Sequence, residues 1–190
     1  MIANQLEMKF VGVDCYCTAV EQGCMIETAK KMYEANIPID EIIKKLQSIA
    51  DSCETVLLCD DLDHMKRGGR LTPMAAALGG LLKIKPVLHI GKSTNGKVDV
   101  LDKVRTMKRA QDRVIKHLKE LNVDSNYTFI VAHVDALDAA KEYAQKIESQ
   151  IEGAKVKVSN NEKNNAINIR NTELTAYPGK AEGDKEISSC

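Results

Sequence analysis

A pair of glycines among cationic residues is the part of this sequence best suited to holding a ligand. Two glycines stand beside three cations, in the order Lys66, Arg67, Gly68, Gly69 and Arg70. Glycine permits positive φ and lets backbone N–H groups approach a ligand closely. Arg70 can hold a carboxylate or a phosphate through two parallel hydrogen bonds. The pattern predicts an anion site, but a tight turn whose arginine pairs with nearby aspartates explains it equally well.

The remaining reactive side chains give no indication of catalysis. The four histidines are scattered along the chain, at His64, His89, His117 and His133. They form no Ser/His/Asp or Cys/His arrangement by spacing, and no Walker or dinucleotide-binding glycine motif is present. The one cysteine cluster, Cys15, Cys17 and Cys24, lacks the spacing of common zinc sites. We therefore predict no catalytic residue, no metal and no cofactor.

Composition excludes several broad classes of protein. Lysine plus arginine equals aspartate plus glutamate, 27 against 27, which gives no global case for nucleic-acid binding. No apolar run approaches the roughly 20 residues that cross a bilayer. A secretory signal needs an uninterrupted apolar stretch near the start of the chain. Here polar residues break that stretch, namely Asn4, Gln5, Glu7 and Lys9. We expect a cytoplasmic protein whose six cysteines are free thiols.

Apolar periodicity predicts alternating helices and strands, which is typical of a layered α/β protein. Strands are expected at 10–13, 55–59, 84–90, 98–101, 129–133 and 155–158. Helices are expected at 20–35, 41–53, 73–82, 103–121 and 137–151, with a helical turn at 62–67. Asp40 is a candidate N-cap, Pro73 suits a first helical turn, and Asn95-Gly96 predicts a hairpin. After residue 159 the chain becomes polar, and Leu174 could belong to an edge strand.

Several motifs taken together resemble the DegV family, the fatty-acid-binding proteins of bacteria. One block is formed by Leu62, Met65, Lys66, Gly68, Gly69, Arg70 and Leu71, and a second by Leu81, Leu82, Ile84, Lys85 and Pro86. The other matching residues are Val13-Asp14-Cys15, Gln22-Gly23, Asn95-Gly96-Lys97, and Arg105 ahead of Lys108 and Ala110. The resemblance covers most of residues 10–157 and is far more specific than any single motif.

The resemblance implies a DegV-like architecture of sheet and helices in which the first part of the N-terminal domain is missing. Residues 1–60 would be the remainder of that domain, 61–158 a region of the C-terminal type, and 159–190 a polar, divergent tail. The family's N-terminal Thr- and Ser-rich motifs, which bind the fatty acid carboxylate, have no counterpart here. Where the family has a His-Thr-Gly segment, the nearest stretch is Ala176-Tyr177-Pro178-Gly179, and Tyr177 offers only a hydroxyl.

The resemblance also implies a function. Family members hold a long-chain fatty acid non-covalently and present it to a separate fatty acid kinase, without doing chemistry themselves. The residues predicted to bind lipid are Gly69, Arg70, Ala76, Leu78, Leu82, Ile84 and Tyr177. The small and aliphatic residues of 75–82 could line an acyl tunnel, although close helix packing explains them without a ligand. Arg105 would meet the kinase, although a solvated basic helix face also accounts for it.

Two other functions are compatible with the sequence. The absent head-group motifs favour a truncated structural or interaction remnant that binds no ligand. A native truncation would expose apolar surface where the missing domain packed, and so predicts either a homo-oligomer or poor solubility. An enzyme subunit that uses Arg70 and Lys85 on a phosphorylated substrate, as the related dihydroxyacetone kinase fold suggests, ranks last because no nucleophile or base is recognisable.

Overall fold

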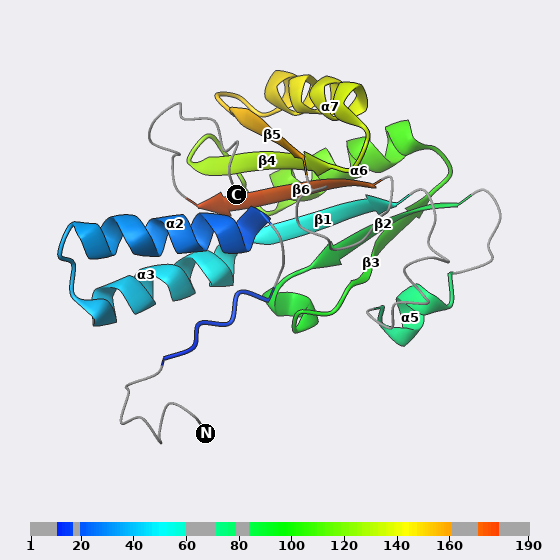
Figure 1. Cartoon of the computed structure of the whole chain (residues 1–190). Coiled ribbons are helices and arrows are strands. Elements are labelled where there is room, and N and C mark those ends of the chain that lie inside the picture. Colours follow the sequence, from blue (N-terminus) through cyan, green and yellow to red (C-terminus); the bar gives the residue numbers. More distant parts are fainter. Residues whose placement is uncertain (1–10, 17–19, 60–70, 79–83, 161–170, 179–190) are drawn as a thin grey trace.

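The computed structural model describes residues 11–16, 20–59, 71–78, 84–160 and 171–178, and only the backbone at Ala76 and across 171–178. Figure 1 shows a sheet with helices packed on both sides. The helices are α2 (Val20–Glu34), α3 (Ile39–Ser52), α5 (Pro73–Ala76), α6 (Met107–Glu120), α7 (Leu137–Gln150) and the 3₁₀ turn η1 (Lys92–Thr94). The strands are β1 (Glu54–Cys59), β2 (Lys85–Ile90), β3 (Asp99–Val104), β4 (Tyr127–His133), β5 (Val156–Asn160) and β6 (Asn171–Pro178).

The six strands form one mixed sheet in the order β3-β2-β1-β6-β4-β5. Neighbouring strands are antiparallel, except that β4 and β5 are parallel and are joined through α7. Helices α6 and α7 cover one face of the sheet, whereas α2, α3 and α5 lie on the other (Figure 1). None of the helices within the described ranges has the length and apolar character that a membrane span requires.

Side-chain alternation along β1 and β2 divides their residues between the two faces. Val56, Leu58 and Val87 belong to the main core beneath α6 and α7. Successive residues of the same strands point the other way and pack with the α5 region, forming a second apolar cluster. Its buried members are Cys59, Ala75, Leu78, Leu88, Ile90 and Val98.

Local capping explains where two helices begin. The Thr72 hydroxyl accepts a hydrogen bond from the Ala75 N–H, and Pro73 occupies the first turn of α5, as its type predicts. The Thr106 hydroxyl likewise accepts from the Arg109 N–H and starts α6. The β2–β3 hairpin turns through Asn95 and Gly96, whose φ angles of 52° and 69° are the positive values that this pair tolerates.

The structure corrects the predicted start of three elements. Residues 11–13 form no strand. Helix α3 begins at Ile39 with Pro38 at its N-cap, so Asp40 lies inside the first turn instead of capping it. The helix expected from residue 103 begins at Met107 because Lys103 and Val104 still pair with β2. The apolar spacing of 103–121 could not separate the last strand residues from the helix.

The polar C-terminal region contains the largest surprise of the fold. Leu174 was expected on an edge strand, but β6 lies in the middle of the sheet, between β1 and β4. Strands from all three predicted regions therefore pair in one sheet. Helix α5 covers 73–76 of the expected 73–82, and residues 77–78 continue as a turn. The turn expected at 62–67 and residues 79–83 lie outside the described residues.

Candidate functional site

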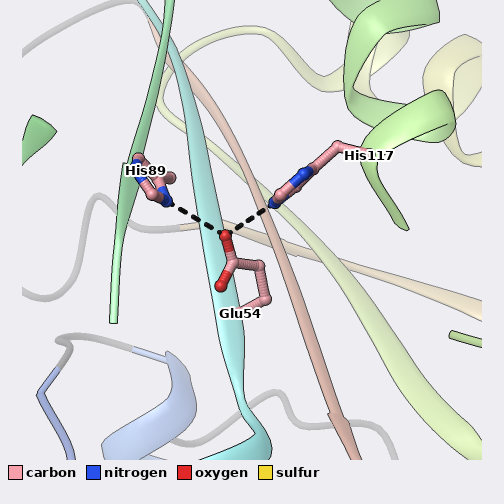
Figure 2. A group of neighbouring side chains, drawn as sticks. All are labelled: Glu54, His89 and His117. Atoms are coloured by element: carbon pink, nitrogen blue, oxygen red, sulfur yellow. Dashed lines mark hydrogen bonds and ion pairs between the residues drawn. The ribbon is translucent and has the colours of Figure 1, made fainter. Parts of the chain in front are cut away.

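A carboxylate and two imidazoles meet on the sheet face that α6 covers (Figure 2). Glu54 opens β1, His89 belongs to β2, and His117 belongs to α6. One carboxylate oxygen, Glu54 Oε1, lies 3.3 Å from His89 Nδ1 and 2.9 Å from His117 Nε2. The two rings stand almost perpendicular to each other, with centroids 6.3 Å apart. We call these three residues the His–Glu–His cluster.

Apolar packing nearby brings the three side chains together. His89 pairs with Val56 across the β1–β2 ladder, and Glu54 lies two residues before Val56, so both polar side chains share its face. On α6, His117 follows Val114 by three residues and therefore lies on almost the same side of the helix. Val56 and Val114 are fully buried in the core between sheet and helix. The polar cluster is thus held at the margin of that core.

The cluster is largely screened from solvent. The side chains of Glu54, His89 and His117 are 14%, 17% and 13% exposed. Burial by itself raises the pKa of Glu54, but the hydrogen bonds and charges of His117 and His89 outweigh it and lower the pKa below its usual value. Glu54 is therefore a carboxylate at neutral pH, and each ring donates an N–H to the same oxygen.

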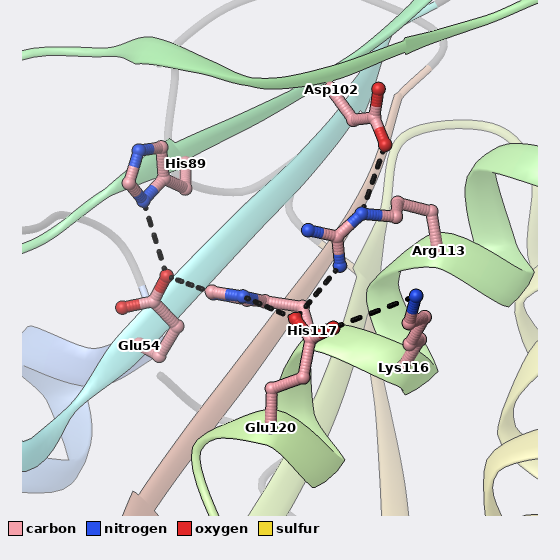
Figure 3. A network of polar contacts seen from close by, with 7 residues as sticks. All are labelled: Glu54, His89, Asp102, Arg113, Lys116, His117 and Glu120. Atoms are coloured by element: carbon pink, nitrogen blue, oxygen red, sulfur yellow. Dashed lines mark hydrogen bonds and ion pairs between the residues drawn. The ribbon is translucent and has the colours of Figure 1, made fainter.

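A second set of charged side chains lies on the side of His117 that faces away from Glu54 (Figure 3). Glu120 Oε2 lies 4.0 Å from His117 Nδ1 and 3.3 Å from Arg113 Nη1. Lys116 Nζ lies 3.8 Å from Glu120 Oε1, and Arg113 Nε donates to Asp102 Oδ2 at 2.9 Å. Glu120 is therefore held beside His117 by two cations of the same helix, while Asp102 joins this network to β3.

A carboxylate oxygen and two imidazole nitrogens are groups that bind divalent transition metals. The three ligand atoms lie within 4.8 Å of one another. Sequence patterns do not reveal this site, because its members are 35 and 28 positions apart and belong to three different elements. One sequence pattern does point to the site, because each histidine lies next to or opposite a residue predicted to be in the core. That pattern indicates which face of the strand or helix the histidine lies on, but not which side chain it contacts.

The structure places only some of the predicted lipid-binding residues. Leu78 is buried in the second apolar cluster, on the face opposite the His–Glu–His cluster. Ile84 is half-buried directly before β2. Ala76 belongs to α5 and Tyr177 to β6, both as backbone only. The other predicted residues, Gly69, Arg70 and Leu82, lie outside the described part of the chain.

The predicted partner residue, Arg105, is exposed where β3 passes into α6. Its neighbours Lys103, Lys108 and Arg109 are exposed as well. This segment therefore presents a basic surface. The role of Arg105 in binding a partner stays a prediction.

The surface of the described residues is hollowed at the two places that follow, among others. One hollow of about 670 Å³ is lined by residues 12–16 together with Gln22, Asn95 and Gly96. It brings together three separate segments that carried the family resemblance, and Gln22 Nε2 lies 3.6 Å from Cys15 Sγ within it. The other, of about 490 Å³, lies at the ends of β4 and β5, where His133 and Asn160 meet the start of α7.

Comparison with known proteins decides the family. A model of the DegV family, described as an uncharacterised protein family, matches residues 1–168. The chain belongs to the DegV family. The DegV domain-containing protein YqaC of Lactococcus lactis is 40% identical over 137 residues, which cover 72% of this chain and 48% of that relative. A Clostridium acetobutylicum DegV domain-containing protein is 31% identical over 148 residues, 77% of this chain and 52% of the relative.

Solved structures of the family confirm the α/β fold. The fatty acid binding DegV family protein SAG1342 of Streptococcus agalactiae superposes with a TM-score of 0.79 at 26% identity, covering 94% of this chain and 63% of that one. DegV of Bacillus subtilis, described as a fatty acid binding protein, superposes at 0.73 with 22% identity, covering 90% of this DegV chain and 61% of the other. The second likeness concerns the fold alone. This chain spans about half the length of the curated relatives it matches.

Proposed function

We propose that this DegV chain takes part in holding a long-chain fatty acid non-covalently. The observation that carries the proposal is its likeness to the Streptococcus agalactiae protein, which is described as fatty acid binding and matches 94% of this chain. Family membership over residues 1–168 supports the same function. The match covers 63% of that structure.

The sheet face opposite the His–Glu–His cluster suits an acyl chain. Leu78, Leu88 and Ile90 are buried there beside the small residue Ala75. Burial of a methylene group contributes about 0.8 kcal/mol, so an acyl chain gains most of its affinity from apolar contact. Ala76, Leu82 and Ile84 are proposed to extend this lining.

The carboxylate of the acid is assigned to the glycine–arginine block. Gly69 would let the backbone approach the head group, and Arg70 would pair with it through a charge-assisted hydrogen bond. Tyr177 would donate one further hydrogen bond. The proposal gives this DegV chain a binding role only, with no covalent step.

We further propose that the basic surface around Arg105 meets a fatty acid kinase. The support is the exposure of Arg105 and of its cationic neighbours Lys103, Lys108 and Arg109. Charge at the rim of an interface mainly accelerates association, so reversal of one such charge should slow it. The test is kinase-dependent phosphorylation of the bound acid with Arg105→Glu. Lys141→Glu, at an exposed position of α7, is the matched control. Equal phosphorylation rates for the two variants would contradict the assignment.

Head-group binding is tested by titration with cis-parinaric acid, a fluorescent fatty acid. A hydrogen bond to a charged group contributes about 1.5–3 kcal/mol, so Arg70→Ala should weaken binding by roughly 10- to 150-fold. Arg109→Ala removes an exposed arginine from α6 and should leave the affinity unchanged. An unchanged affinity in Arg70→Ala would remove Arg70 from the site. A wild-type protein that binds no fatty acid would reject the function itself.

A further inference from the structure

We propose that Glu54, His89 and His117 form a binding site for one divalent transition-metal ion, with Zn²⁺ the ion that fits best. Neutral imidazole nitrogens and a carboxylate oxygen are preferred Zn²⁺ ligands, and a site with three protein ligands keeps a fourth position for water or another small ligand. The proposal does not depend on fatty acid binding, because the cluster lies on the face opposite the proposed acyl site.

The spacing of the ligand atoms supports coordination. Zn²⁺ takes such ligands at about 2.1 Å, and a tetrahedral arrangement then separates neighbouring ligand atoms by roughly 3.4 Å. His89 Nδ1 lies 3.3 Å from Glu54 Oε1, and His117 Nε2 lies 2.9 Å from it. The third side of the triangle, between the two nitrogens, is within 4.8 Å. In that geometry the separation of His117 Nε2 from Glu54 Oε1 would lengthen by about 0.5 Å, and the two nitrogens would lie roughly 3.4 Å apart.

The surroundings of His117 provide a second, independent argument. A histidine that binds a metal usually directs its other ring nitrogen toward a carboxylate, which orients the ring and raises its basicity. Here Nε2 faces Glu54, while Nδ1 faces Glu120 Oε2 at 4.0 Å. Arg113 and Lys116 hold Glu120 in that place (Figure 3). The arrangement has the order carboxylate, imidazole and proposed ion.

A purely hydrogen-bonded network is the alternative. Without metal, each ring donates a hydrogen bond to the same Glu54 oxygen. Coordination requires those two nitrogens to offer lone pairs, so each neutral ring must carry its proton on the opposite nitrogen. For His117 that nitrogen is Nδ1, which lies 4.0 Å from Glu120 Oε2. The negative charge of Glu120 favours a proton on Nδ1, as metal coordination through Nε2 requires, whereas a neutral ring that donates to Glu54 carries its proton on Nε2.

The proposed ion would join three separate elements of the DegV fold. Its ligands come from β1, β2 and α6, so binding would tie the helix to the sheet at the margin of the core. A ligand that binds only the folded protein raises its melting temperature in proportion to the logarithm of ligand concentration. Zn²⁺ should therefore stabilise this chain, and the stabilisation should depend on all three side chains.

The test is titration of metal-free protein with Zn²⁺ in competition with a chromophoric chelator, repeated with Co²⁺ to read the ligand type from its visible spectrum. The wild-type protein should bind one equivalent, and its Co²⁺ spectrum should show nitrogen and oxygen ligation without a thiolate charge-transfer band. Loss of a residue that only supports a metal ligand lowers metal affinity by up to about 100-fold. Loss of a direct ligand should cost more, so His89→Gln, His117→Gln and Glu54→Gln should each lower the Zn²⁺ affinity at least about 100-fold. Glu120→Gln should lower it about tenfold.

His133→Gln is the matched control, because it removes one imidazole from β4 and leaves the cluster intact. Its glutamine oxygen can still accept the Ala136 N–H that His133 Nδ1 accepts now. The control should keep wild-type affinity and the metal-dependent rise in melting temperature. Melting curves recorded without metal verify that each variant folds. If Glu54→Gln fails to fold, the test rests on His89→Gln, because His89 is the most exposed of the three side chains.

Two results would overturn the site. One is a wild-type protein that takes no Zn²⁺ from the chelator at micromolar concentrations. The other is a Co²⁺ complex with thiolate bands whose affinity is unchanged in the cluster variants, because that result would place the ion on some of the six cysteines. Loss of fatty acid binding with intact metal binding would reject the proposed function and leave this site standing.

Discussion

Strands β1 and β2 present two different faces, and the contrast separates what supports the fold from what is proposed to bind lipid. Beneath α6, Val56, Leu58 and Val87 pack into the main core, and the His–Glu–His cluster lies at the margin of that core. On the opposite face, Leu88 and Ile90 pack with the smaller α5 region. The same two strands therefore contribute to a main core, a polar cluster at its margin and a second buried apolar cluster.

Neighbouring residues of one strand can therefore serve separate functions. Leu57 and Leu58 are adjacent in sequence, yet they belong to different apolar clusters because side chains alternate across a sheet. Substitutions on one face should change stability and metal binding. Substitutions on the other should change stability and lipid binding. The following predictions test that separation.

The largest effect is expected from a matched pair of leucine truncations, Leu58→Ala and Leu88→Ala. Both side chains are almost completely buried, one on each face. Each truncation should destabilise the DegV chain by about 2–5 kcal/mol in denaturant unfolding. Only Leu88→Ala should also weaken fatty acid binding per folded molecule. Equal loss of lipid affinity in both variants would break the distinction between the faces.

A smaller effect is expected at the polar cluster. Glu54→Ala leaves two half-buried imidazoles without their shared acceptor, which should cost about 1–3 kcal/mol in the presence of a chelator. The double variant Glu54→Ala with His117→Ala should cost less than the sum of the two single changes, because the residues interact directly. Additive losses would show that the contact between Glu54 and His117 contributes nothing to stability.

Tyr143 reports how dry the α6 and α7 face is. Its hydroxyl lies 3.5 Å from the Gln111 carbonyl oxygen, and burial, followed by the charge of Asp112, raises the pKa of Tyr143 far above its usual value. Above pH 10 the unfolded chain releases this proton more readily than the folded one. Stability should then fall by about 1.4 kcal/mol per pH unit from this group alone.

Phenylalanine at position 143 removes that proton and provides the comparison. The stability of Tyr143→Phe should decline less steeply with pH than that of the wild-type protein over the same alkaline range. Parallel declines in urea unfolding would mean that Tyr143 is not held in a dry environment.

The smallest effect is expected at the outer charges. Arg113 contacts Asp102 and Glu120 near the surface, where ion pairs contribute about 0–1 kcal/mol. Arg113→Ala should therefore change the midpoint of urea unfolding only slightly, and less still at high salt. It should nevertheless lower metal affinity, because Glu120 loses a group that holds it beside His117. A stability loss as large as that of Leu58→Ala would show that this network belongs to the core.

Local patterns predicted the elements of this DegV fold well and their assembly less well. Apolar spacing identified α2, α7 and β4 within one or two residues, and Asn95-Gly96 identified the hairpin. The central place of β6 could not be derived, since a short segment with few apolar residues has the same pattern at an edge or in the middle. The pairing partner is a property of the whole sheet.

The candidate sites differ in the same way. The glycine–arginine block and the lysine–proline block are contiguous in sequence, so they could identify the family. Glu54, His89 and His117 have no motif, because a strand start, a second strand and a helix bring them together only in the fold. Residue types alone could not indicate that two histidines share one carboxylate oxygen.

Fatty acid binding can be tested by native mass spectrometry of the purified chain, followed by denaturing extraction and lipid analysis. We expect a long-chain fatty acid in near-stoichiometric amount, reduced in Leu88→Ala and retained in Leu58→Ala. A purified chain that carries no lipid and takes up no added fatty acid would contradict that expectation, and would leave a DegV fold without the proposed function.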